Sequence, residues 1–248
     1  MFLTNMALPP LIIDFFVALI FIVMWVSYFL YSRAMAKQSD SLSNAMKTHR
    51  VSAVNHVVQS ETKIAGAVIL SNVDRNVSFF ASTTLLILAS LTGLLAKAAD
   101  VVLVIEQLPY VYPISTSQVY LRILLLISIY IYAYFTLTWA LRQSSFVSVM
   151  IGAGATNGTA NDKAYAYHTA KLMDMAAHSE NQGLRAYYFS LAALTWFYHP
   201  LAFILSSLLI IFILYRREFK SKTTDLLVQA KQCLPASLDI TDAKEITR

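Results

Sequence analysis

Three long apolar segments constrain this chain more than any other feature of its sequence. They cover residues 11–32, 77–96 and 119–141. A helix needs about 20 apolar residues to cross the roughly 30 Å hydrocarbon core of a bilayer, so each segment predicts a membrane-spanning helix. Strands of a membrane barrel would alternate apolar and polar residues, and these segments do not. The sequence therefore predicts an all-α, polytopic membrane protein, in agreement with its 57% apolar and 13% charged residues.

A fourth apolar block, residues 186–215, contains the sequence WFYHPLAF at 196–203. As one helix it would be about 45 Å long, which exceeds the thickness of a bilayer core. A proline lacks a backbone N–H and disfavours helical geometry in the residue before it. We therefore predict a helical hairpin with arms 186–199 and 201–215 and its tip at His199–Pro200. A single kinked helix is the alternative.

The lysines and arginines are distributed unevenly between the connections, and this predicts the topology. The segment before residue 11 has none, the connection 33–75 has six, and the connection 142–185 has four. The connection 97–118 has only Lys97. Because connections rich in basic residues stay on the cytoplasmic side, the N-terminus is expected outside. The basic sequence RREFKSK after the hairpin places the C-terminus in the cytoplasm.

The two long connections are predicted to be cytoplasmic and to contain amphipathic helices. Apolar residues recur at near-helical spacing within 39–73, and a second helix is expected over 161–180. Such helices commonly lie along the membrane surface. Residues 1–233 are therefore expected to form a single helical membrane domain, and residues 234–248 a flexible cytoplasmic tail.

Polar residues at membrane depth are the first candidates for a functional site, because they are costly there. Tyr130, Tyr134, Thr138 and Arg142 are spaced by four and form a polar stripe on the third span. The stripe could line a path for a solute or a proton. Hydrogen bonds that hold helices together are the simpler explanation, and we favour it.

Two further features belong to the spans. Small side chains on the second span would let another helix approach closely: Ser82, Thr83, Ala89 and Gly93. Asp14 and Arg122 both lie near the outer ends of their helices. They could pair with each other or reach the membrane interface separately, and the interface is the favoured prediction.

Four arginines are predicted at the cytoplasmic ends of the spans: Arg75, Arg185, Arg216 and Arg217. Topology and lipid headgroups explain them better than an anion site or a docking site for a partner. The same argument accounts for the net charge of +5, so no nucleic acid is expected as a partner.

No catalytic, cofactor-binding or metal-binding residue can be assigned. Only His199 of the five histidines lies in an apolar block, so no facing pair for a haem is expected. Asp174 and His178 share a helix face, but two ligands do not make a metal site. No nucleophile has an adjacent base, which argues against an enzyme.

Four segments in this order resemble one known family: VDRNVSFFASTTLLILASLTGLL, YAYFTLTWALRQSSF, GLRAYYFSLAALTWFYHPLAF and LYRREF. The chain is similar to the bacterial membrane-protein family known as domain of unknown function 599. The resemblance implies a location in the bacterial inner membrane. It implies no reaction, so it provides no catalytic residues to carry over.

Two classes of function fit these observations. The first is a non-catalytic accessory, assembly or scaffold component, with the lipid bilayer and other membrane subunits or its own copies as partners. The second is a channel or transporter for a small solute or ion, with the stripe from Tyr130 to Arg142 facing an aqueous cavity. The absence of an inverted repeat and the few charges at midplane count against the second.

Overall fold

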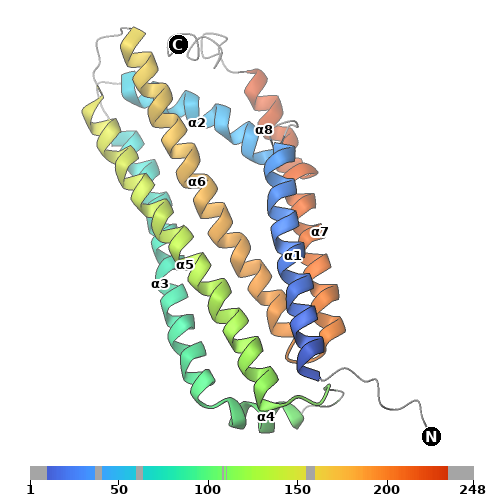
Figure 1. Ribbon diagram of the computed structural model, residues 1–248. Coiled ribbons are helices and arrows are strands. Elements are labelled where there is room, and N and C mark those ends of the chain that lie inside the picture. Colours follow the sequence, from blue (N-terminus) through green and yellow to red (C-terminus); the bar gives the residue numbers. More distant parts are fainter. Residues whose placement is uncertain are drawn as a thin grey trace, which may run out of the picture. The chain divides into compact units, whose positions relative to one another are not determined.

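The computed structural model describes residues 10–36, 41–59, 64–107, 109, 111–154 and 160–233. Within these residues the fold is all-α and contains no strand, as predicted (Figure 1). The helices are α1 (Pro10–Ala36), α2 (Leu42–Gln59), α3 (Ile64–Ala96), α4 (Ala98–Glu106), α5 (Thr116–Ala153), α6 (Ala160–Thr195), α7 (Pro200–Phe219) and α8 (Lys222–Gln232). The tail predicted at 234–248 lies outside the described residues.

Among the described residues, four helical stretches are long and apolar enough to cross a membrane. They are Leu11–Met35, Leu70–Ala96, Thr116–Ala153 and Pro200–Gln232. The first three contain the three predicted spans. The fourth begins at Pro200 and contains the second arm of the predicted hairpin.

The hairpin at His199–Pro200 is confirmed as a fold. Helix α6 ends at Thr195, and α7 begins at Pro200. The two arms run back along each other, because the hydroxyls of Thr195 and Ser206 lie 2.8 Å apart and the rings of Trp196 and Phe203 stack with centroids 4.9 Å apart. His199 also helps to start α7, since its Nδ1 accepts a hydrogen bond of 3.1 Å from the N–H of Leu201.

Two predicted boundaries were wrong. Helix α6 is continuous from residue 160 to 195, whereas the sequence suggested separate helices over 161–180 and from 186. Gly183 lies between the two predicted helices. A glycine inside a helix destabilises it by about 1 kcal/mol relative to alanine. That is too little to end a helix that is packed on both sides of the glycine. In the first connection, α2 ends at Gln59 and α3 begins at Ile64, so residues 39–73 belong to two helices.

The chain folds into two compact units. Unit 1 comprises residues 1–33, 84–133 and 184–214, and unit 2 comprises residues 34–83, 134–183 and 215–248. Helices α1, α3, α5, α6 and α7 contribute residues to both.

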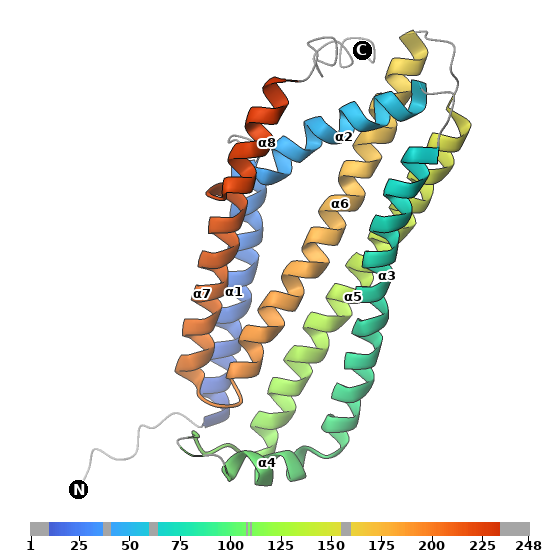
Figure 2. The ribbon, with the colours of Figure 1, turned by 180° about the vertical axis from the view of Figure 1, so that it is seen from behind.

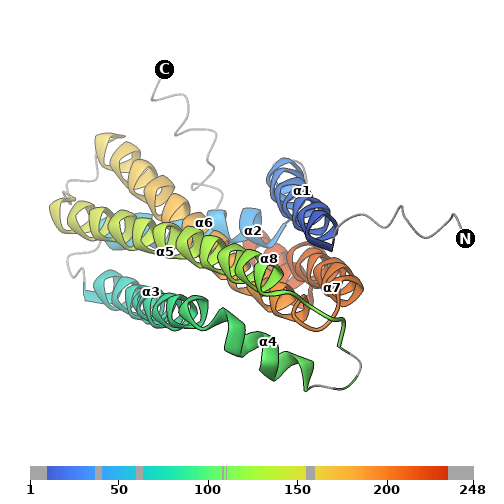
Figure 3. The ribbon, with the colours of Figure 1, turned by 60° about the horizontal axis from the view of Figure 1, so that its bottom comes forward.

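The core of unit 1 is aromatic. In this unit α1 lies beside α7 (Figure 3), where the rings of Phe21 and Phe203 are 4.8 Å apart. Phe189 of α6 contacts Phe21 edge to face, with ring centroids 5.9 Å apart. Trp196 is fully buried beside them. Together these rings attach the hairpin to α1.

The core of unit 2 is built from smaller side chains. Val54 of α2 packs against Ala166 and Ala170 of α6. Val57 of α2 packs with Leu70, Val147 and Ile151, from α3 and α5. Helix α8 lies against α2 (Figure 2), and His49 Nε2 donates to the carbonyl of Leu227 over 3.0 Å.

Candidate functional site

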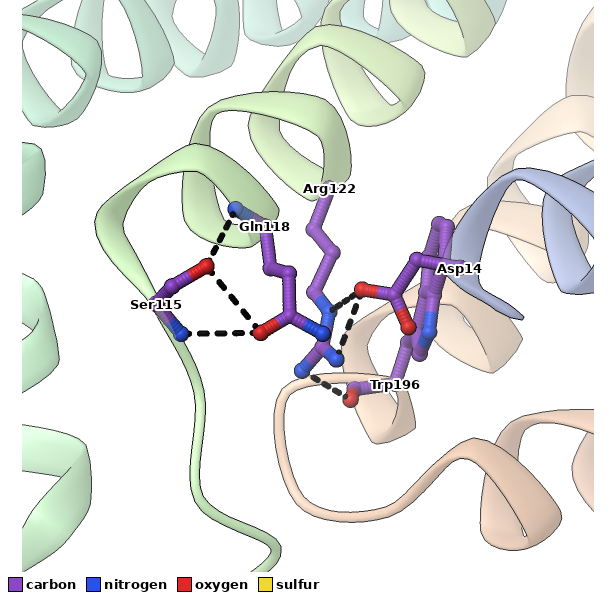
Figure 4. Close-up of polar contacts among 5 residues, drawn as sticks. All are labelled: Asp14, Ser115, Gln118, Arg122 and Trp196. Atoms are coloured by element: carbon purple, nitrogen blue, oxygen red, sulfur yellow. Dashed lines mark hydrogen bonds and ion pairs between the residues drawn. The ribbon is translucent and has the colours of Figure 1, made fainter. Parts of the chain in front are cut away.

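A buried ion pair lies inside unit 1. Arg122, in the second turn of α5, donates from Nε and Nη2 to Oδ2 of Asp14 on α1, over 3.1 and 2.9 Å (Figure 4). Each side chain is at most 1% exposed. The Nη1 of Arg122 donates to the carbonyl of Trp196 over 2.7 Å. This carbonyl is available because the last carbonyls of a helix have no partner within it.

The aromatic ring of Trp196 completes the surroundings of the arginine. The Arg122 guanidinium lies 5.2 Å from the centroid of the Trp196 ring, which stacks on Phe203. Favourable cation–π contact of this kind is strongest where water is excluded. The arginine therefore connects α1, α5 and the turn of the hairpin.

The predicted interface anchoring of Asp14 and Arg122 was therefore wrong, and the alternative that they pair is correct. An isolated charge buried in a low dielectric is far more costly than a paired one, so once both side chains are buried they must meet. The sequence could place each charge near the outer end of its helix. It could not show that α1 and α5 are neighbours.

A capping motif at the start of α5 positions the arginine. The Oε1 of Gln118 accepts hydrogen bonds from the N–H of Ser115 at 2.8 Å and from its hydroxyl at 3.2 Å. Gln118 is itself 2% exposed. Ser115-x-x-Gln118 has the spacing of a capping box, so this cap could have been predicted from the sequence and was missed.

Two pairs of hydroxyls join other helices of unit 1. The hydroxyl of Ser190 on α6 donates to the hydroxyl of Tyr130 on α5 over 2.9 Å. The hydroxyls of Thr84 on α3 and Tyr187 on α6 lie 2.6 Å apart. The rings of Tyr130 and Tyr187 meet edge to face with centroids 5.4 Å apart. Tyr130, the first residue of the predicted stripe, thus takes part in a contact between helices.

The remaining residues of the stripe have other surroundings. Tyr134, Thr138 and Arg142 belong to unit 2. The Thr138 hydroxyl donates to the carbonyl of Tyr134 over 2.8 Å, and exposed Arg142 lies over the ring of Phe146 at 5.9 Å. No hydrogen bond joins two side chains of this stripe, all of which are described.

The predicted packing residues of α3 face outward. Ser82, Ala89 and Gly93 are exposed, and Thr83 is half-buried with its hydroxyl donating to the carbonyl of Phe79 over 2.8 Å. A Cβ added at Gly93 would have no atom within 4 Å. No described helix of this chain covers Gly93, so packing against another molecule stays a prediction.

The four arginines differ in their surroundings. Arg185 belongs to unit 1, where it donates to the hydroxyl of Ser32 over 3.0 Å and lies 5.5 Å from the ring centroid of Tyr28. Arg75, Arg216 and Arg217 belong to unit 2 and are exposed. Arg185 therefore attaches α6 to α1, whereas a role of the other three in binding lipid or a partner stays a prediction.

A second group of charges lies in unit 2, and the sequence did not reveal it. Arg50 of α2 donates from Nη1 to Oδ1 of Asp174 on α6 over 2.7 Å. Glu180, also on α6, is near enough to feel the charges of Arg50 and of Asp74 on α3. Burial raises the pKa of Glu180, while the positive charge of Arg50 lowers it and the negative charge of Asp74 raises it further. His178, which follows Asp174 by four positions on α6, contacts the side-chain nitrogen of Gln182 at 2.6 Å.

The family of this chain follows from a direct comparison. Residues 16–223 match the model of the family described as "Protein of unknown function, DUF599". The chain belongs to this family. The family match covers the Arg122–Trp196 contact and all the unit 2 charges named above, but it begins two residues after Asp14. No curated protein and no solved structure matches the chain.

Proposed function

We propose that this protein is a non-catalytic component of a membrane assembly, acting as an accessory or scaffold subunit or as a homo-oligomer in the bacterial inner membrane. The strongest support is that polar side chains of unit 1 are hydrogen-bonded within the chain itself. Arg122, Asp14, Tyr130 and Thr84 all bond to other side chains of the same chain. Groups satisfied in this way hold helices together and are poorly placed to coordinate a passing solute.

The proposed contact surface is the outward face of α3 in unit 1. Leu86 is 71% exposed on this face, and Ala89 and Gly93 are exposed beside it. Small residues allow two helix backbones to approach closely, so that dispersion contacts accumulate where no hydrophobic effect operates between helices. A leucine at residue 89 or 93 would prevent that approach without disturbing the chain's own packing.

The first experiment is to extract the tagged protein in mild detergent and to measure the mass and composition of the complex. We expect either a stoichiometric foreign subunit or a homo-oligomer for the wild type, and dissociation in Gly93→Leu. The control is Gly152→Leu on α5, because a Cβ at Gly152 also meets no atom within 4 Å. A wild-type protein that is monomeric in detergent and in bilayer nanodiscs would contradict the proposal.

The second class, a channel or transporter, is tested on the same material. Tyr134→Phe and Thr138→Val should lower stability modestly and leave no transport defect to measure. A selective loss of solute flux through liposomes containing a stably assembled Thr138→Val variant would favour the channel instead.

The proposed topology has the N-terminus outside and the C-terminus in the cytoplasm. Thr223→Cys in a Cys233→Ser background should resist an impermeant maleimide in intact cells, and Gln107→Cys should react. Both positions are exposed. Labelling of residue 223 from outside would show that α7 has the opposite orientation to the one proposed.

A further inference from the structure

The turn of the hairpin in unit 1 uses a histidine to cap a helix. His199 immediately precedes α7, which begins at Pro200, so it occupies the N-cap position. Proline suits the first position of a helix, because its geometry is already helical and the N–H that it lacks would have no partner there. The N–H of Leu201 does need an acceptor, and His199 Nδ1 provides one over 3.1 Å.

A histidine cap differs from the usual caps in its response to protons. The side-chain oxygen of a serine, threonine or asparagine accepts a hydrogen bond whatever the pH, whereas a histidine nitrogen accepts only while it carries no proton. Protonation makes both ring nitrogens donors, so Nδ1 would face the N–H of Leu201 without a bond. It also places a positive charge at the N-terminus of α7, where the helix dipole disfavours a cation.

The groups around His199 give a positive charge little compensation. The ring of Tyr112, from the connection between α4 and α5, meets the imidazole edge to face with centroids 5.7 Å apart. A contact between a cation and an aromatic ring is weak where it is open to solvent, and Tyr112 is 41% exposed. The other titratable group beside it is Tyr198. Among the described residues, no carboxylate forms an ion pair with His199.

The same turn also holds other parts of unit 1. The N–H of Tyr112 donates to the carbonyl of Tyr198 over 3.2 Å, and the hydroxyl of Tyr198 donates to the carbonyl of Pro109 over 3.4 Å. Arg122 of α5 donates to the carbonyl of Trp196. The start of α7 therefore lies where the hairpin, α5 and the connection before α5 are bonded together.

We propose that His199 is a pH-sensitive cap that controls how firmly the hairpin turn is held. The neutral ring caps α7. Protonation, in the range of about pH 8 to 5 where histidines titrate, removes the cap, so the first turn of α7 opens more often. The stabilisation is therefore present at the upper end of this range and is lost as the pH falls through it. This switch does not depend on the proposed function, since it needs no partner.

The test is hydrogen exchange at the amides of residues 201–203 in the full-length protein in detergent, at about pH 8 and about pH 5. The reference is His199→Asn, because asparagine is a strong N-cap that does not titrate. Comparing the two proteins at one pH cancels the dependence of the exchange chemistry itself on pH. We expect equal rates at the higher pH and a rate roughly 2- to 30-fold faster in the wild type at the lower pH, which corresponds to the loss of a cap. The same ratio at both pH values would overturn the proposal.

Two further variants make the test specific to this histidine. His199→Ala has no cap at either pH, so its exchange should be faster than that of His199→Asn at both. His168→Asn replaces an exposed histidine of α6 and should behave like the wild type. Equal rates in His199→Ala and His199→Asn, or loss of the pH effect in His168→Asn, would refute the role of His199.

The contact with Tyr112 is separated from the cap by one more pair of proteins. Tyr112→Leu removes the ring beside the imidazole and keeps the backbone bond to Tyr198. Compared with the double variant Tyr112→Leu, His199→Asn, it should show an increase at the lower pH at least as large as that of the wild type. Disappearance of the increase would show that the contact with Tyr112, and not the cap, responds to the proton.

Discussion

The two units place charge inside a helical protein in opposite ways. In unit 1, the single negative charge of Asp14 balances the single positive charge of Arg122. Two N–H groups of the arginine bond to the carboxylate, and both side chains are almost fully buried. In unit 2, Arg50 pairs with Asp174 over 2.7 Å, and the two side chains remain 16% and 28% exposed. In a fully buried pair each charge depends on its partner, because water cannot solvate either one. In a partly solvated pair water stabilises both charges, so the pair contributes less to stability.

The two pairs are expected to contribute differently to the fold. The unit 1 pair uses its hydrogen-bonding groups on the backbone and side chains of the same chain. The unit 2 pair leaves its charges partly exposed to solvent. The first pair is therefore expected to contribute more to stability than the second.

The largest effect is expected from separating the unit 1 pair. Asp14→Asn leaves a buried guanidinium without its counter-charge, which costs about 3–5 kcal/mol. The double variant Asp14→Leu, Arg122→Met should lose much less than either single change, because it leaves no unpaired charge. Unfolding in mild detergent, followed by tryptophan fluorescence, measures both. A double variant as unstable as the sum of the single variants would break the comparison, since the two residues would then be independent.

The next largest loss of stability is expected from a change in the packing of unit 2, which involves no charge. A Cβ at buried Gly66 of α3 would collide with the side chain of Val57 on α2, so Gly66→Ala should cost about 1–3 kcal/mol by overpacking. The control Gly152→Ala meets open space and should be neutral or stabilising by about 0.5–1 kcal/mol. The same unfolding measurement applies. Equal effects of the two changes would mean that α2 and α3 do not approach each other closely.

A smaller effect is expected from removing Arg50 of unit 2. Because its ion pair is partly solvated, Arg50→Gln should cost about 1 kcal/mol at neutral pH. The loss should shrink on acidification, since protonation of the carboxyl groups relieves their mutual repulsion. Thermal unfolding at several pH values follows this change. A loss as large as that of Asp14→Asn would erase the distinction between the two units.

The smallest effect is expected at Trp196. Its Nε1 is buried and has no hydrogen-bond partner among the described residues, so Trp196→Phe removes an unpaired donor while keeping a ring against Phe203. The change in stability should stay within about 1 kcal/mol, because losing the unpaired donor offsets part of the lost contact area. A loss several times larger would show that the indole N–H has a partner and that the unit 1 group extends further than Figure 4 draws.

The sequence by itself determined the features that depend on neighbouring residues in the chain. The apolar segments predict the helices, because a run of apolar side chains and its backbone hydrogen bonds are local properties. The break at His199–Pro200 was predictable for the same reason, since proline acts on its own residue and the one before it. The continuity of α6 through Gly183 was missed, because packing on both sides outweighs a weak local preference.

Only the tertiary structure decided which polar residues meet. Asp14 and Arg122 are 108 positions apart, and Arg50 and Asp174 are 124 positions apart. Whether such residues pair depends on which helices are neighbours and on how each helix is rotated, and no local pattern contains that information. Burial then makes the outcome decisive, because a charge that is harmless at a surface must find a partner or a proton once water is excluded.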